Sequence, residues 1–361
     1  MDDVARSAAW AALASVSLAT PVAVALLRAF GSPQAVLAAS RASVESIAGR
    51  ANAERIAARD ATRDEATAAW LAERGHRLVA LDDADYPRQL LEIPDPPLAL
   101  FALGRVELCS RASIAIVGSR QGSPQGVEDA RAFARIFAEA GLTVVSGLAQ
   151  GIDAAAHRGA LDTPASTIAV TGTGPDRVYP ARHRDLAHAI AEHGALVTEF
   201  APGTPPVKAN FPRRNRLISG LARGVLVVEA APGSGSLITA RFAVEQGRDV
   251  FAIPGSIHSP LSKGPHRLIR DGAKLVETAH DVLAELGLVA TSVASGAPSP
   301  ELPADPAQAR VLDAMGRGPV DLDRLVTRTG LAADALAATL VLLELDGRVA
   351  ALPGGGWERL R

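Results

Sequence analysis

The chain has 361 residues, 39 acidic and 37 basic side chains, and a hydrophobic fraction of 48%. This length predicts two or three domains, and the composition is that of folded protein rather than of a disordered chain. The single cysteine, Cys109, excludes an intrachain disulfide, and no Cys/His pair has the spacing of a structural zinc site.

Residues 1–80 are rich in alanine at helical spacing and predict a small helical domain. The uncharged run between Arg6 and Arg28 is interrupted by Pro21, so it does not predict a membrane span. Thr20 is the expected N-cap of a helix that ends before Gly31. The acidic start MDDVAR is unlike a secretory signal, and we expect a cytoplasmic protein.

Residues 81–290 are expected to form the main domain, with 81–110 as a Pro-rich connector packed on it. Short Val/Ile runs bounded by glycine then alternate with helical segments. Such runs are typical of strands buried on both faces, so the fold class is α/β, an extended Rossmann-like doubly wound sheet that is mostly parallel. The expected strands are 113–118, 142–147, 167–172, 195–200, 224–230, 249–255 and 274–277.

Residues 291–307 are rich in Ser, Pro and Ala and are interpreted as a linker. Residues 308–361 then predict three helices and a hairpin, the order of a winged helix. Its expected recognition helix, 332–345, contains Asp334 and Glu344 but no Lys or Arg. Because phosphate neutralisation dominates duplex affinity, we expect protein contact or packing there rather than reading of a DNA groove.

Two strand-end loops predict anion binding. VGSRQGSPQG, residues 117–126, lacks the dinucleotide-binding glycine pattern, but Ser119 and Arg120 could hold a phosphate at the start of the next helix. The alternative is a plain turn with an exposed arginine. In EAAPGSGSLITAR, residues 229–241, Ser234 and Ser236 lie at a second helix start, where the alternative is simple helix capping.

The stretch VKANFPRRNRLISG, residues 207–220, combines an aromatic ring with positive charge, and no Asp or Glu occurs from Phe200 to Val228, so we infer that this charge is unneutralised. A ring stacks bases while cations track the backbone of a single strand, so Lys208, Phe211, Arg214 and Arg216 predict nucleic-acid binding. Alternatively Phe211 anchors its helix in the core. A second acid-free run, 250–270, suggests that both runs belong to one positive surface.

No catalytic set is recognisable. Asp153 and His157 lie four residues apart, but no metal trio or nucleophile accompanies them, so we interpret them as a capping carboxylate and a packed histidine. Glu199, Glu229 and Glu245 are expected to be structural partners of arginines. We expect no metal, no cofactor and no enzymatic activity.

The motifs IAIVGSR, VVSGLAQGIDAAAH, NFPRRNRLISGLA and VVEAAPGSGSLITARFAVEQGRDVFAIPG occur in one order and resemble the DprA (Smf) family over about residues 85–285. This resemblance implies a homodimer that binds and protects single-stranded DNA without strong sequence preference and helps to load RecA in natural transformation. It also implies a sterile-alpha-motif-like N-terminal domain and a C-terminal winged helix. By motif, it assigns DNA binding to Arg120, Lys208 and Phe211, with Arg214 and Asn215 beside them.

One departure from the family pattern is Pro265-His266, where Thr-Asn is common. Two other functions compete. A nucleoside-monophosphate phosphoribohydrolase would use similar loops, but it needs a glutamate where this chain has Thr239. A winged-helix regulator would bind a particular duplex, which the uncharged recognition helix argues against.

Overall fold

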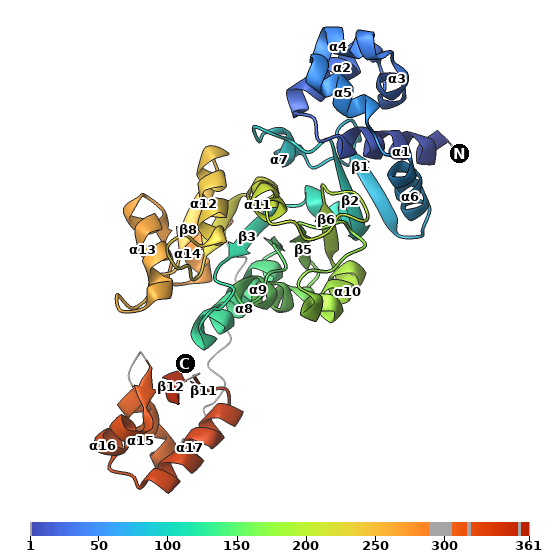
Figure 1. Ribbon diagram of the computed structural model, residues 1–361. Coiled ribbons are helices and arrows are strands. Elements are labelled where there is room, and N and C mark those ends of the chain that lie inside the picture. Colours follow the sequence, from blue (N-terminus) through green and yellow to red (C-terminus); the bar gives the residue numbers. More distant parts are fainter. Residues whose placement is uncertain (1, 289–304, 316–318, 353–354, 361) are drawn as a thin grey trace.

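The computed structural model describes residues 2–288, 305–315, 319–352 and 355–360. Along these residues the chain forms N-terminal helices, a large central sheet covered by helices, and a small C-terminal unit (Figure 1). The expected fold class is confirmed, since the sheet is mostly parallel and lies between a helical region and a winged helix. The linker predicted at 291–307 lies outside the described residues up to 304, and Pro306 already begins a helix.

The central sheet has nine strands in the order β1-β2-β6-β5-β4-β3-β7-β8-β9. All seven strands predicted from the sequence are present, and every pair among them is parallel. The chain moves outward from β3 to β6 and then returns to place β7 on the other side of β3. The strands are β3 (Ser113–Val117), β4 (Thr143–Ser146), β5 (Thr167–Val170), β6 (Ala195–Thr198), β7 (Gly224–Val227), β8 (Asp249–Ala252) and β9 (Lys274–Leu275).

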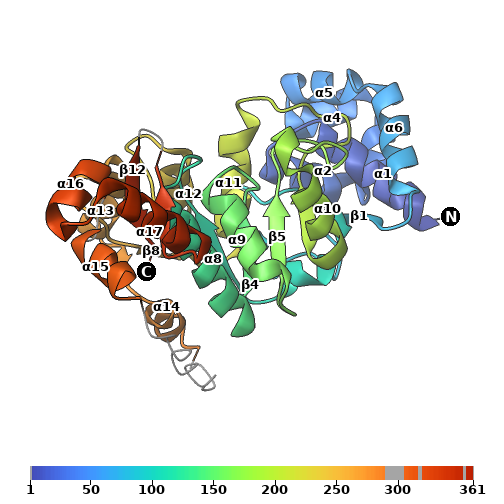
Figure 2. The same ribbon diagram turned by 90° about the horizontal axis from the view of Figure 1, so that it is seen from below.

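Alternation along each strand divides the sheet into two buried faces. Ile114 and Ile116 of β3 pack on α8 (Pro124–Glu139), α9 (Ile152–Leu161) and α14 (Ala279–Glu285). Ala115 and Val117 point to the opposite face, which α11 (Asn210–Leu221) and α12 (Gly235–Glu245) cover. Figure 2 shows the helices of both layers around the strands. The remaining α-helices of the central domain are α7 (Arg88–Leu91), α10 (Arg184–His193) and α13 (Lys263–Arg270).

The expected connector, 81–110, is more than a packed segment, because it supplies the sheet strand β2, and the five residues before it form a further strand, β1. β1 (His76–Ala80) and β2 (Ala99–Gly104) pair with each other antiparallel, and β2 pairs antiparallel with β6. These two strands were not predicted from the sequence, because β2 is buried on both faces and its apolar run has no alternation, while β1 is a short edge strand. We therefore propose that the helical domain ends near residue 75 rather than at residue 80.

The N-terminal domain consists of α1 (Asp2–Ser15), α2 (Thr20–Phe30), α3 (Pro33–Ala38), α4 (Arg41–Ala48), α5 (Arg50–Ala57) and α6 (Ala61–Leu71). Thr20 is the first residue of α2 and not its N-cap, so that expectation was wrong. Its hydroxyl lies 2.6 Å from the Pro96 carbonyl oxygen and 3.1 Å from Asp95 Oδ1. This side chain therefore ties the helical domain to the segment before β2 instead of capping its own helix.

The C-terminal unit has the predicted three helices and hairpin, around a core that includes Leu325 and Leu340. Its elements are α15 (Pro306–Met315), β10 (Val320–Asp321), α16 (Leu322–Thr329), α17 (Ala333–Leu345), β11 (Val349–Ala351) and β12 (Gly356–Arg359). In the described part of the chain, no single helix is long and apolar enough to cross a membrane; α16 and α17 pass that test only as a pair bent by 107°.

His157 of α9 is fully buried, as its interpretation as a packed residue requires. The backbone N–H of Leu148 donates to its Nε2 at 3.3 Å, and its Nδ1 lies 2.7 Å from the hydroxyl oxygen of Thr167. The Thr167 hydroxyl itself donates to Val144, so Nδ1 carries the proton and the ring is neutral. Burial and the nearby cation Arg214 lower the pKa of His157 to about 3.

This histidine predicts a specific loss of stability in acid. In the unfolded chain the His157 imidazole takes up a proton with a pKa of about 6.5, whereas in the folded chain it stays neutral down to about pH 3. The free energy of unfolding therefore falls by about 1.4 kcal/mol per pH unit below pH 6.5. In urea denaturation between pH 8 and 5, His157→Gln should show a shallower pH dependence than wild type. His188→Gln, an exposed position, should not. Parallel curves for wild type and His157→Gln would contradict this account.

Candidate nucleic-acid interface

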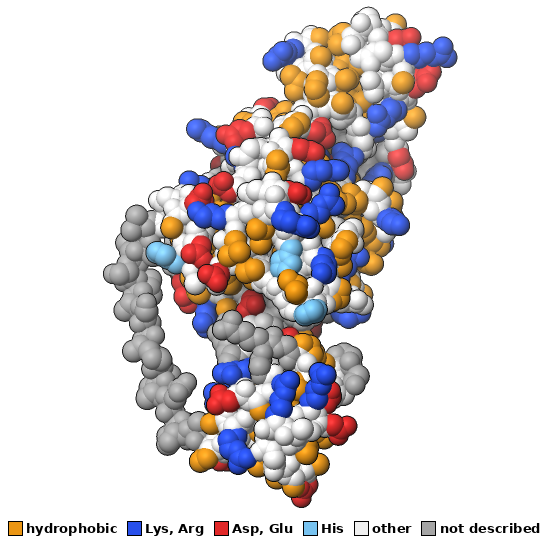
Figure 3. Space-filling model, turned by 90° about the vertical axis from the view of Figure 1, so that its left-hand side faces the viewer, with side chains coloured by type: hydrophobic (Ala, Val, Ile, Leu, Met, Phe, Trp, Pro, Cys, Tyr) orange, Lys and Arg blue, Asp and Glu red, His pale blue; other side chains and the backbone are white. Residues whose placement is uncertain are grey.

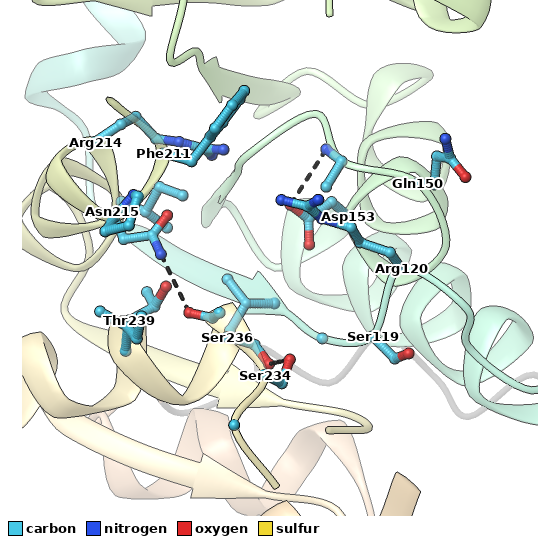
Figure 4. Close-up of a pocket in the computed structure, with 18 of the residues that line it drawn as sticks. Ser119, Arg120, Gln150, Asp153, Phe211, Arg214, Asn215, Ser234, Ser236 and Thr239 are labelled. Carbon is cyan, nitrogen blue, oxygen red and sulfur yellow. Dashed lines mark hydrogen bonds between the residues drawn. The ribbon is translucent and has the colours of Figure 1, made fainter. Parts of the chain in front are cut away.

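A cavity of about 920 Å³ opens where the strand order changes direction, beyond the carboxyl ends of β3, β4 and β7. Open α/β sheets bind ligands at such a point, because neighbouring loops diverge there. All eight residues predicted to bind nucleic acid line this cavity: Ser119, Arg120, Lys208, Phe211, Arg214, Asn215, Ser234 and Ser236. In Figure 4 the side chains of α11 lie on one side and those of the β3 and β4 loops face them.

The β3–α8 loop brings Ser119 and Arg120 to the cavity wall. The Ser119 amide donates to the Glu229 carbonyl at 2.7 Å, and its hydroxyl oxygen accepts from the Gln121 amide at 3.1 Å. Gly151 has a φ of 72°, and a Cβ there would lie 2.4 Å from the backbone carbonyl oxygen of Ser119. Only glycine therefore permits the close approach of the β4–α9 loop to the β3–α8 loop. The loop is fixed by backbone contacts, while Arg120 itself is exposed.

Phe211 lies at the cavity surface rather than in the core. Its ring is half-buried and its centroid is 5.3 Å from that of Tyr179. The guanidinium carbon of Arg120 lies 5.9 Å from the same ring centroid. The helix is anchored instead by Leu217, Ile218 and Leu221, which are buried against the sheet. The alternative in which Phe211 is the core anchor is therefore wrong.

Arg214 lies at the cavity floor, 5% exposed, opposite the buried carboxylate of Asp153. Burial lowers the pKa of Arg214 to about 10, and the charge of Asp153 opposes that shift. Burial likewise raises the pKa of Asp153, against the effect of Arg214 and of backbone N–H groups. A Cβ on Gly147 would lie 1.7 Å from an Arg214 nitrogen and 2.8 Å from an Asp153 oxygen, so both charges converge on this glycine.

The acid-free stretch is largely neutralised by residues from outside it. Glu199, which precedes the stretch, pairs with Arg216 and lies 3.2 Å from Arg213. The inference that this charge is unneutralised was therefore wrong for these two arginines. In contrast, Arg120 and Lys208 form no ion pair within the described residues, and both are exposed. Those two cations give the cavity its uncompensated positive charge.

The α12 end of the cavity is open to a ligand. Ser234 is the N-cap residue, but no side chain caps the helix; its hydroxyl oxygen lies 2.8 Å from that of Ser236. The capping interpretation of these serines is therefore wrong. Asn215 Nδ2 donates to the Gly235 carbonyl at 3.2 Å, which joins α11 to this turn (Figure 4). The arrangement leaves a helix N-terminus and two hydroxyls available to an anion.

Sequence reasoning missed several lining residues. Tyr179 follows β5 in the motif DRVYPARH, and an aromatic beside a strand end was the available signal. Asp153 was interpreted as a cap, and its Oδ2 does accept from the Gly147 amide at 3.2 Å, but it also faces Arg214. Glu245 pairs with Arg241 as expected, whereas Glu229 binds the Ser123 amide and hydroxyl instead of an arginine.

The second acid-free run does not contribute to this cavity, since no residue of 250–270 lines it. Arg267 of α13 lies 3.5 Å from Asp271, and Lys263 donates to the Ile257 carbonyl. On the face that carries α12 and α13, Lys and Arg side chains are interspersed with Asp and Glu (Figure 3). Within the described residues, no group of three His, Cys, Asp or Glu side chains could hold a metal ion.

Comparison with known proteins gives a consistent result. The model of the DNA recombination-mediator protein A family matches residues 77–287, and that of the DprA winged helix domain matches residues 295–355. The chain is 44% identical to protein Smf of Escherichia coli, covering 82% of this chain and 81% of that protein. It is 50% identical to DNA processing protein DprA of Streptococcus pneumoniae, over 57% of this chain and 72% of that protein.

Two solved structures are also similar. The crystal structure of DprA from Streptococcus pneumoniae superposes with a TM-score of 0.67 at 40% identity, covering 76% of this chain and 95% of that one. DprA from Helicobacter pylori, described for its unique single-stranded DNA binding mode, has a TM-score of 0.53 at 28% identity, with 58% and 95% coverage. The family matches, the relatives and the shared fold all agree: this chain belongs to the DprA/Smf family of DNA-processing, recombination-mediator proteins.

Proposed function

We propose that this protein binds single-stranded DNA without strong base preference, protects it, and helps to load RecA for recombination in natural transformation. The observation that carries the proposal is the half-buried ring of Phe211, which has Tyr179 and the unpaired cation Arg120 beside it. A base can stack on such a ring only after it has left the duplex stack, and every base offers the same flat face. This geometry favours single strands and disfavours sequence readout.

The phosphates have separate partners around the ring. Lys208 and Arg120 supply charge, and Ser234 and Ser236 supply hydroxyls at the start of α12. Arg214 and Asn215 have a supporting role: Arg214 lies near Asp153 at the cavity floor, and Asn215 Nδ2 donates to the Gly235 carbonyl. The homodimer, the RecA contact and action in the cytoplasm are proposed from family membership.

Binding without catalysis fits the cavity better than nucleotide hydrolysis. Thr239 is 1% exposed where a phosphoribohydrolase has its glutamate. Asp153 is the acidic residue among the described lining residues, and it is 6% exposed and held by Arg214 and backbone N–H groups. A carboxylate so engaged is poorly placed to act on a ribose. Release of free base from a nucleoside monophosphate by the purified protein would decide for the hydrolase instead.

Phe211→Ala should weaken binding of oligo-dT by about 1 to 3 kcal/mol, because one base loses its stacking platform. The salt dependence should stay the same, since no charge is removed. Fluorescence anisotropy at several salt concentrations measures both quantities. Phe242→Ala is the matched control, because that half-buried ring also lies under an arginine but outside the cavity. Equal losses for both variants, or unfolding of Phe211→Ala by circular dichroism, would count against a stacking role.

Lys208→Gln and Arg120→Gln should each lower affinity for all sequences alike. Each should also reduce the slope of log affinity against log salt by about 0.7, the value for one phosphate contact on a single strand. Arg223→Gln removes an equally exposed arginine at the start of β7, the end of the strand opposite the cavity, and should leave the slope unchanged. An unchanged slope in the first two variants would show that neither side chain contacts phosphate.

RecA loading needs its own assay. On a strand coated with single-strand-binding protein, wild type should shorten the lag before RecA begins to hydrolyse ATP. Phe211→Ala should not do so at concentrations where only wild type holds the strand. If wild type binds the coated strand but leaves the lag unchanged, strand binding stands and the RecA part of the proposal fails.

A further inference from the structure

A second cavity, of about 330 Å³, lies between the N-terminal helices and the central domain. It shares a wall with the first cavity, the segment 205–210 before and at the start of α11. Pro206 and Lys208 line the first cavity, whereas Pro205, Val207 and Asn210 line the second. Neighbouring residues of this segment thus line different cavities, so the segment forms a ridge between them, and a DNA strand that crosses the ridge passes directly from one cavity to the other.

The second cavity carries net positive charge. Its basic residues are Arg63 of α6, Arg213 and Arg216, and its acids are Asp95 and Glu199. Both acids are already engaged: Glu199 pairs with both α11 arginines, and Asp95 lies 3.4 Å from Arg216 Nε. Arg63 donates to the Thr204 hydroxyl at 2.6 Å and forms no ion pair in the part of the chain that the structure describes. One cation from the N-terminal domain is therefore left for a ligand.

An aromatic ring lies in this cavity as well. Phe200 follows β6 and is half-buried, and the guanidinium carbon of Arg213 lies 5.7 Å from its ring centroid. The first cavity has the same combination, with Arg120 5.9 Å from the Phe211 centroid. A half-exposed ring beside a cation is the arrangement that binds bases of any sequence. The volume is at the lower end of ligand pockets, which suits a single nucleotide.

We propose that this second cavity is a nucleotide subsite for the same DNA strand: the strand crosses the Val207–Lys208 ridge, a base contacts Phe200, and Arg63 of the N-terminal domain contacts a phosphate. The inference rests on the proposed single-strand binding and extends it, because it makes the helical domain part of the binding surface. The N-terminal domain is held in place for this role, since Thr20 bonds the segment before β2 and Arg63 bonds Thr204.

The subsite predicts that affinity depends on strand length in a particular way. Oligo-dT too short to cross the ridge uses only the first cavity, whereas longer oligomers also reach the second. Arg63→Gln should therefore leave the affinity for the shortest bound oligomers unchanged and weaken that for longer ones by up to about fivefold, the range of one exposed ionic contact. Phe200→Leu, which keeps apolar packing but removes the flat ring, should show the same length dependence.

Arg50→Gln is the control, because it removes an exposed arginine of the same domain that lines neither cavity. Equal effects of Arg63→Gln at all lengths, or no effect at any length, would overturn the subsite. The first-cavity variant Phe211→Ala separates the two ideas: if it lowers affinity at all lengths while Arg63→Gln changes nothing, single-strand binding holds and only the subsite fails. If wild type binds no oligomer, the proposed function itself fails.

Photocrosslinking gives a readout that does not depend on variants. Oligo-dT with 4-thiothymidine at single positions is irradiated on the wild-type protein, and the adducts are mapped by mass spectrometry. Adducts near Tyr179 and Phe211 are expected at one position, and adducts near Phe200 or Arg63 at a neighbouring position. Adducts confined to the first cavity at every position would overturn the proposal.

Discussion

The binding cavity is built over two buried opposite charges that converge on Gly147, Arg214 on α11 and Asp153 at the start of α9. Both are almost fully removed from water. Burial disfavours the charged form of each, while the charge of each favours ionisation of the other. These charges lie where the strand order changes direction, and their attraction favours the packing of the helix that follows β6 against the loop that follows β4. Phe211 projects from the same helix as Arg214, three residues earlier, so the position of α11 also places the ring at the cavity.

Charge neutralisation by nearby acids explains which basic side chains around the cavity remain free to bind a ligand. The arginines of α11 point to different sides: Arg214 faces Asp153, while Arg213 and Arg216 face Glu199 on the opposite side of the helix. Arg214 and Arg216 are buried, and an uncompensated guanidinium in the protein interior would be costly, so these two side chains are structural first, whereas Arg213 lies at the surface. The free cations, Arg120 and Lys208, lie at exposed positions where a mobile polyanion can replace water.

Much of the fold was predictable because its signals are local. Runs such as SIAIVG and GVLVVEA are apolar on both faces and bounded by glycine, which identifies central parallel strands. β1 and β2 were not predicted, since β2 is buried on both faces and shows no alternation, and β1 is a short strand at the edge of the sheet. The N-cap prediction for Thr20 was wrong because it rested on residue type alone. Its hydroxyl instead has partners at Pro96 and Asp95, 75 or more residues away.

The sequence by itself determined the family, the order of the seven parallel strands along the chain and eight of the residues that line the cavity, because motif order and strand-end position are local properties. Only the tertiary structure decided which of those residues are free to act. Phe211 proved to be a half-buried ring at the cavity surface and Arg214 a buried cation that faces Asp153, although they are three positions apart in one acid-free run. The neutralising acids, Asp153 and Glu199, lie outside that run, and only folding brings a carboxylate to a distant guanidinium.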